Sequence, residues 1–215
     1  MKKRIRTRYG IAICLLVAFA WWTILVRFVD TRAIGPMESS VGFATLNGWV
    51  RDLVGVHMTL YMITDWLGLI PIATTLGFAI FGLIQWIRRK QLRKVDHSIL
   101  LLGGFYVVVM VMYLLFEKIT INYRPLLIDG CLEASYPSST TMLVMCVMPT
   151  AAIQFWTRIQ NLALRWCVTV AIASFVAFMI VGRLLSGVHW ITDIIGGILL
   201  STGLVTMYDA LTEHT

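Results

Sequence analysis

The sequence predicts an all-α, polytopic membrane protein with six transmembrane helices and an interfacial helix between the first and the second. Of its 215 residues, 59% are hydrophobic and only 13% are charged, and the mean hydropathy is +0.81. Soluble domains have about 45–50% apolar and roughly 25% charged residues. The apolar residues are concentrated in blocks of about 17–22 residues, long enough to cross a hydrocarbon core about 30 Å thick. Basic residues cluster beside these blocks.

The first apolar block follows a basic amino terminus. Met1–Arg8 contains five Lys and Arg residues, and the apolar run Ile11–Val26 comes next. A signal peptide begins in the same way, but Trp21 and Trp22 occupy positions where cleavage requires small residues. We therefore predict that this block is a retained first span.

Five further apolar blocks complete the predicted spans: Ile63–Ile87, Ile99–Phe116, Thr140–Trp156, Trp166–Leu185 and Trp190–Met207. Between the first two spans, Asp30–Tyr61 has apolar residues at roughly helical spacing among polar ones. This pattern is typical of an amphipathic helix at the interface, and an ordinary loop fits it equally well. The length fits one membrane domain over residues 1–215, without a second.

The distribution of Lys and Arg predicts the orientation. About two-thirds of them lie at the amino terminus or in the connections 86–96 and 157–165. By the positive-inside rule these segments, and with them both termini, are cytoplasmic. Topology then explains the net charge of +7, so we expect no nucleic-acid partner. We expect the protein to lie in the bilayer of a plasma (cytoplasmic) membrane. The connections expected to face outward are Arg27–Thr64, Glu117–Ser139 and Leu185–His189.

Several ionisable residues at the outward ends of the spans need a separate explanation, because burying a charge in lipid is costly. They are Lys118, Arg124, Arg183, His189 and Asp193. The hydroxyl-rich run Ser135–Thr141 opens the fourth span on the same side. Cations, a histidine, a carboxylate and a helix start rich in hydroxyl groups suit an anionic phosphate.

His189 and Asp193 are four residues apart, so they share one face of a helix. Asp193 is then able to accept a hydrogen bond from one ring nitrogen of His189, which leaves the other nitrogen free to attack phosphorus. Arg183 lies across a tight turn containing Gly187 and suits two-pronged binding of phosphate oxygens. Each residue alone has a simpler explanation, as a helix cap or an interfacial anchor, but together they indicate a site.

Three motifs resemble those of the type 2 phosphatidic acid phosphatase family, whose pattern is shared with bacterial acid phosphatases and vanadium haloperoxidases. Gly182-Arg183, five residues, His189, three residues and Asp193 resemble its third signature. Lys118 to Arg124-Pro125 resembles the first signature, and Tyr136–Thr141 resembles the second. The resemblance extends from the third span to the end of the sixth, with the core motifs within 118–193.

The resemblance implies that His189 is the nucleophile, forming a phosphohistidine that water hydrolyses, and that Asp193 orients it. It also implies that no metal or cofactor is needed. The implied binding groups for the phosphate are Lys118, Arg124, Arg183, Ser138 and the backbone amides of Ser139 and Thr140.

Two departures from the family pattern matter. Lys118 precedes Arg124 by six residues, where the family has seven, so on a continuous helix the two side chains lie about 120° apart. Lys118 then reaches the site only if the helix unwinds, and Glu117 occupies the seven-residue position. In the second signature, Thr140 stands where the family has a histidine that protonates the leaving alkoxide. Losing a general acid typically costs about 10²–10⁴-fold in rate.

The sequence therefore predicts an enzyme that hydrolyses a lipid phosphate or diphosphate at the outer membrane face. Thr140 favours a polyprenyl diphosphate such as undecaprenyl diphosphate, because a departing phosphate needs a proton far less than an alkoxide does. Phosphatidic acid and phosphatidylglycerol phosphate remain candidate substrates. A phosphotransferase, and a catalytically weakened lipid-phosphate binder or transporter, are the alternatives. Asp129, Glu133 and His57 are further outward residues able to donate the missing proton.

Overall fold

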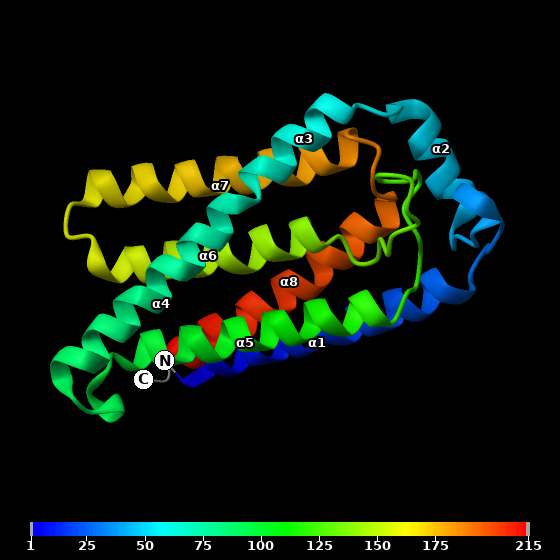
Figure 1. The fold of residues 1–215 in the computed structure, drawn as a ribbon. Helices are drawn as coiled ribbons and strands as arrows, with labels where there is room; N and C mark the ends of the chain where they lie inside the picture. The colour runs from blue at the N-terminus through cyan, green and yellow to red at the C-terminus, as the bar shows by residue number, and fades with distance from the viewer. Residues whose placement is uncertain (1, 214–215) are drawn as a thin grey trace.

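The computed structural model describes residues 2–213, and these residues form a bundle of helices (Figure 1). The α-helices are α1 Lys2–Phe28, α2 Ala44–Val54, α3 Met58–Leu67, α4 Leu69–Arg89, α5 His97–Lys118, α6 Ser139–Arg158, α7 Leu162–Leu185 and α8 Ile191–Thr212. Two short 3-10 helices, Pro36–Glu38 and Leu92–Lys94, lie in the connections.

Six helical segments within residues 2–213 are long and apolar enough to cross a membrane. They are Arg4–Phe28, Met58–Arg89, His97–Lys118, Ser139–Arg158, Leu162–Leu185 and Ile191–Thr212. Each contains most or all of one predicted apolar block, so the six predicted spans are confirmed and the chain is an integral membrane protein. The helix expected between the first two spans is confirmed as α2, against the loop alternative.

The second span is divided into α3 and α4 at Gly68. Pro71 explains the division, because it has no N–H to bond to the carbonyl of Leu67 and its ring clashes with that group. The amide of Gly68 bonds back to the carbonyls of Thr64 and Asp65, at 3.1 and 3.0 Å. The break sets the direction of α3, which packs on α7 near the site.

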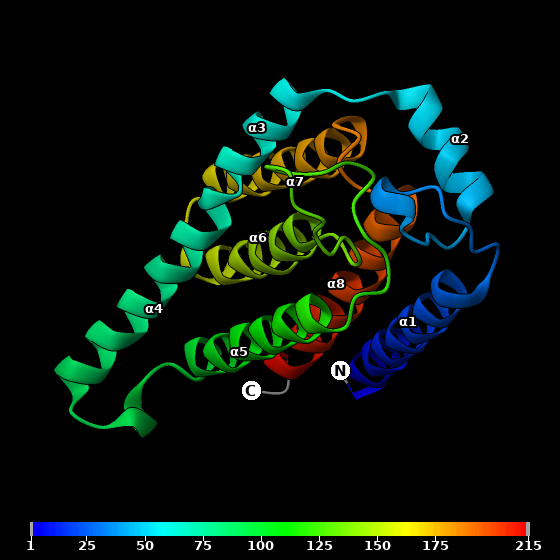
Figure 2. The same ribbon diagram turned by 45° about the vertical axis from the view of Figure 1, so that its right-hand side comes forward.

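The connections group at two ends of the bundle (Figures 1 and 2). The start of α1, the end of α8 and the connections α4–α5 and α6–α7 share one end, where Arg8 forms ion pairs with Asp209 and Glu213 at 2.6 and 2.8 Å. The helix α2, the segment 119–138 and the turn before α8 share the other end. This grouping agrees with the predicted alternation of connections, while their assignment to the inside and the outside stays a prediction.

The centre of the bundle is formed by α6 and α8. In the most apolar stretch of each span, half of the residues of α6 and 44% of those of α8 are buried. In the other spans this share is at most 22%. Glycine lets α8 approach its neighbours closely, since a Cβ added at Gly196 would lie 2.6 Å from the Tyr136 ring. The amino-terminal ends of these two central helices carry the candidate site.

Candidate active site

The segment after α5 folds into a short hairpin rather than continuing the helix. The amide of Arg124 bonds to the carbonyl of Glu133 at 3.0 Å, and the amide of Ser135 bonds to that of Asn122 at 2.9 Å. At the tip, Asp129 and Gly130 have φ of +49° and +76°. Positive φ at both central residues is what a type I′ hairpin turn requires, and Asp-Gly is among its preferred pairs. The hairpin therefore brings Arg124, Glu133 and Ser135 side by side.

Hydrogen bonds tie this hairpin and the start of α6 to the start of α8. The indole Nε1 of Trp190 donates to the carbonyl of Tyr123 at 2.7 Å, and the amide of Ser138 donates to the carbonyl of Asp193 at 3.1 Å. On the other side, Asn47 of α2 donates to Thr192 Oγ1 at 3.0 Å. Three chain segments are thus fixed around one helix end.

His189 and Asp193 are joined through Ser135. The hydroxyl of Ser135 donates to Asp193 Oδ2 and lies 3.2 Å from His189 Nδ1. The direct distance from His189 Nδ1 to Asp193 Oδ2 is 3.8 Å, which is too long for a hydrogen bond. Because the Ser135 proton is directed at the carboxylate, its oxygen accepts from His189, and the ring proton is at Nδ1. The lone pair of His189 then lies at Nε2.

The tight turn before α8 depends on Gly187. Its φ is +71°, and a Cβ added there would come within 2.1 Å of the Gly55 carbonyl oxygen. Only glycine fits this position. The turn brings the end of α7, with Arg183, back to His189 at the start of α8.

His189 is held in its neutral form. Burial lowers the pKa of His189 well below its ordinary value of 6.5, and the positive charges of Arg124 and Arg183 lower it further. Its side chain is almost wholly buried, and Nε2 has no hydrogen-bond partner among the described residues. A neutral imidazole with a bare Nε2 is the form of histidine that acts as a nucleophile.

Arg183 is buried and contacts two helices. Its Nη2 donates to Thr140 Oγ1 of α6 at 2.7 Å and lies 3.6 Å from Asp65 Oδ1 of α3. Its Nη1 lies 3.4 Å from Thr64 Oγ1, and its guanidinium carbon lies 5.0 Å from the centre of the Tyr61 ring. These contacts hold the guanidinium in one position.

Arg124 forms an ion pair with Glu133, with 3.0 Å between Nε and Oε2. Its Nη1 is buried without a hydrogen-bond partner in the described part of the chain, and the same holds for Arg183 Nε. Buried polar groups in proteins are usually hydrogen-bonded, so each unpaired one needs an explanation. Two unpaired guanidinium nitrogens and a bare His189 Nε2 fit an anion that is bound at this place.

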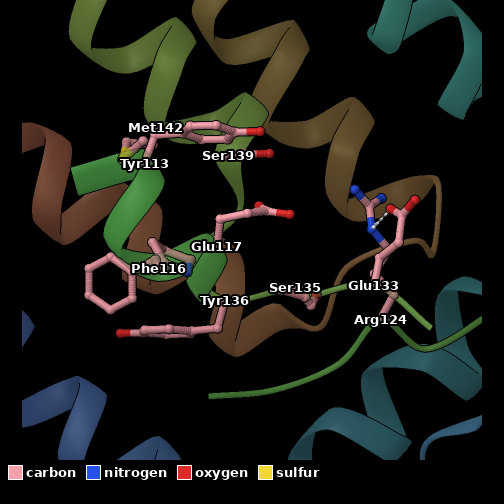
Figure 3. A pocket seen from close by; sticks show the side chains of 11 residues that line it. Tyr113, Phe116, Glu117, Arg124, Glu133, Ser135, Tyr136, Ser139 and Met142 are labelled. Carbon is pink, nitrogen blue, oxygen red and sulfur yellow. Dashed lines mark ion pairs between the residues drawn. The ribbon is translucent and has the colours of Figure 1, made fainter. Parts of the chain in front are cut away.

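A cavity of about 270 Å³ opens beside Arg124 (Figure 3). Figure 3 shows the Arg124–Glu133 pair on one side, and Glu117 projecting from α5 into the same space. Its wall is formed by Tyr113, Phe116, Glu117, Arg124, Glu133, Ala134, Ser135, Tyr136, Pro137, Ser139 and Met142. His189 is not among the residues that line this cavity, but its Nδ1 contacts Ser135, which does line it. The cavity therefore borders the buried cluster at Arg124 and Ser135.

The remaining predicted phosphate-binding residues differ in position. Ser138 is the N-cap of α6, and its hydroxyl accepts from the amide of Thr141 at 3.4 Å. Ser139 lines the cavity, and Thr140 contacts Arg183. The amides of both lie in the first turn of α6, where N–H groups have no acceptor within the helix.

Lys118 is the predicted residue that the structure does not bring to this cluster. The helix α5 ends at Lys118, so the chain does leave the helix before Arg124, as the prediction required. Lys118 is nevertheless exposed, and its neighbour Glu117 lines the cavity instead. Its role in phosphate binding stays a prediction without support from this geometry.

Several residues of the cluster were not anticipated. Ser135 was part of the hydroxyl-rich run, but its position between His189 and Asp193 depends on the hairpin. Asp65 carried a readable signal, since it is a charged residue inside a predicted span, and such residues are usually functional. Of the suggested proton donors, Asp129 is exposed at the hairpin tip and His57 is exposed with Nε2 3.0 Å from the Val54 carbonyl.

The fold and the cluster together define a helical integral membrane protein with a buried histidine near two arginines. Residues 116–212 match the family model of the PAP2 superfamily. This match confirms the resemblance noted in the sequence.

Most of the chain has the fold of a solved structure. That structure is described as the first transmembrane PAP2 type phosphatidylglycerolphosphate phosphatase from Bacillus subtilis. It superposes with a TM-score of 0.61 over 94% of this chain and 96% of that chain, at 18% identity. No curated protein sequence matches this chain.

Proposed function

We propose that the protein is a phosphatase that hydrolyses a lipid phosphate through a phosphohistidine at His189. The observation that carries the proposal is the bare, buried Nε2 of His189, with Nδ1 held by Ser135 and with Arg124 and Arg183 nearby. The match of residues 116–212 to the PAP2 superfamily model supports a phosphatase. The six spans support a substrate that lies in the bilayer, as does the lipid named for the Bacillus subtilis protein.

The geometry suits a reaction in two steps. In the first step, the lone pair of His189 Nε2 forms a bond to phosphorus while the bond from phosphorus to the lipid oxygen breaks. The imidazole becomes positive, and its Nδ1 proton is held by Ser135, which is bonded to Asp193. Arg124, Arg183 and the amides of the first turn of α6 bind the phosphate oxygens, whose charge grows in the transition state.

In the second step, water attacks the phosphorus of the phosphohistidine and the bond from phosphorus to Nε2 breaks. Inorganic phosphate leaves with the oxygen and the protons of the water. The two arginines keep their places, since they bind oxygens that stay on phosphorus throughout. His189 returns to its neutral form with the proton at Nδ1, ready for another substrate.

The identity of the lipid depends on the leaving group. Thr140 supplies no proton to a departing alkoxide, so a polyprenyl diphosphate is the preferred substrate unless another acid faces the leaving oxygen. Phosphatidic acid and phosphatidylglycerol phosphate are monoesters and need such an acid. By the positive-inside rule, the site is proposed to face outward from a plasma membrane, with both termini in the cytoplasm.

Two other functions use the same cluster. A phosphotransferase would form the same phosphohistidine and pass the phosphate to an acceptor other than water. A lipid-phosphate binder or transporter would need the arginines but not an oriented nucleophile. The neutral His189 with its proton fixed at Nδ1 therefore favours a covalent mechanism over binding alone.

The test is phosphate release by the purified protein from a panel of lipid monophosphates and diphosphates, for wild type and His189→Ala. We expect release by wild type only, and an acid-labile, base-stable phosphoprotein when radiolabelled substrate is trapped. His57→Ala is the matched control, because His57 is exposed on the same end of the bundle, and this variant should behave as wild type. Undiminished turnover by His189→Ala would refute the mechanism.

A further inference from the structure

A second cavity, of about 470 Å³, lies between α3–α4, α5 and α6. Its wall is mainly apolar and includes Leu69, Ile72, Val109 and Leu143. Tyr113, Ser139 and Met142 line both this cavity and the polar one beside Arg124, so the two spaces adjoin at the start of α6.

Asp65 supplies a carboxylate to the wall of the apolar cavity. It lies inside the span Met58–Arg89, where an ionisable side chain costs free energy and usually has a function. Its Oδ1 is 3.6 Å from Arg183 Nη2, and that same nitrogen donates to Thr140 Oγ1 at 2.7 Å. Arg183 thus contacts both Asp65 and Thr140, the residue that stands where the family has its proton donor.

The two cavities divide the parts of a lipid phosphate between them. The apolar lining suits the hydrocarbon, and the unpaired nitrogens of Arg124 and Arg183 suit the phosphate. A lipid phosphate bound across both cavities would have its ester bond where they adjoin, with its leaving oxygen on the side of the apolar cavity. Asp65 lies on that side, whereas Glu117 and Glu133 line the polar cavity.

We propose that Asp65 is the general acid of this chain, donating a proton to the leaving lipid oxygen. This inference rests on the proposed function. In the first step, His189 Nε2 bonds to phosphorus, the phosphorus–oxygen bond to the lipid breaks, and the lipid oxygen takes the proton of the Asp65 carboxyl. In the second step, water attacks phosphorus and gives its proton to the Asp65 carboxylate, the phosphorus–Nε2 bond breaks, and phosphate leaves.

Substrate binding brings the phosphate close to Asp65. In the free protein the Asp65 carboxyl group lies next to Arg183, with 3.6 Å between Oδ1 and Nη2. A phosphate that binds Arg183 therefore lies near Asp65 as well.

The test compares two leaving groups in Asp65→Asn, a variant of nearly the same shape. With a long-chain alkyl phosphate, we expect the first step to slow by at least about a hundredfold, since an alkoxide needs a proton. With p-nitrophenyl phosphate, whose phenolate leaves without taking up a proton, the rate of the first-turnover burst should stay within about threefold of the wild-type rate. Slow water attack should then leave the phosphoenzyme accumulated.

Glu133→Gln is the matched control, because Glu133 pairs with the other arginine. It should change both first-step rates by the same factor. Equal losses for both substrates in Asp65→Asn would show that Asp65 only positions Arg183, and unchanged rates would show that it has no role. Either result overturns the inference while a wild-type burst and phosphoenzyme still support the proposed function. Absence of a phosphoenzyme in wild type would instead refute the proposed function.

Discussion

Replacing Ser135 by alanine removes the link between His189 and Asp193 and leaves both in place. The hydroxyl lies 3.2 Å from His189 Nδ1 and donates to Asp193 Oδ2. Without it, Asp193 Oδ2 keeps the amide of Trp190 at 2.9 Å, but Nδ1 faces a carboxylate 3.8 Å away. The imidazole then has no acceptor for its proton at hydrogen-bonding distance.

The lost interaction grows in the transition state, because the imidazole becomes positive as the bond to phosphorus forms. A hydrogen bond to a charged group is worth about 1.5–3 kcal/mol. At about 1.4 kcal/mol for each factor of ten, kcat/KM for Ser135→Ala should fall roughly 10- to 150-fold. A shift of the ring toward Asp193 would recover part of this loss, so the upper figure is a limit.

The assay is kcat/KM for phosphate release, together with the rate of phosphoenzyme formation. Ser201→Ala is the control, since Ser201 is also fully buried, but its hydroxyl donates to the carbonyl of Met142 at 3.3 Å within the bundle. It should keep wild-type activity. If Ser135→Ala forms the phosphoenzyme at the wild-type rate, the inferred proton position on His189 is wrong.

Two further predictions concern protonation. Because burial lowers the pKa of His189 below 6.5, the folded protein keeps this side chain neutral as pH falls through that value. The rate of phosphoenzyme formation from p-nitrophenyl phosphate should therefore show no loss centred near pH 6.5, and a loss centred there would contradict the burial of His189. Thr140→His should raise the ratio of monoester to diphosphate kcat/KM, and the rise should be larger when Asp65 is also replaced by asparagine. An unchanged ratio in both backgrounds would show that position 140 does not face the leaving oxygen.

The spans were predictable because hydropathy and the position of basic residues respond directly to the bilayer. The break at Gly68 also had a signal in Pro71, although the apolar run around it reads as one block. The hairpin at 122–135 was not anticipated, even though Asp129-Gly130 is a turn signal. Its strands are too short to show alternation, so local sequence alone does not define their pairing.

The motif spacing correctly grouped His189 and Asp193 on one helix end, and the turn at Gly187 brought Arg183 to them. The Ser135 link was beyond sequence reasoning, since it depends on how the hairpin packs on α8 through Trp190. The position of Lys118, in contrast to the Ser135 link, was predictable from the sequence. Its six-residue separation from Arg124 indicated a different face, and the end of α5 leaves it exposed.

The two arginines of the free site already have anionic partners, and this pairing bears on the choice between enzyme and binder. Arg124 and Arg183 are 11% and 2% exposed at their side chains, whereas Glu133 and Asp65 are 43% and 58% exposed. A buried charge without a partner is strongly destabilising, so these carboxylates stabilise the empty site. A bound phosphate competes with these carboxylates for the two arginines. The same competition acts on the product and favours release of inorganic phosphate. A protein selected only to hold a lipid phosphate gains nothing from such competitors, whereas an enzyme that must empty its site after each turnover does.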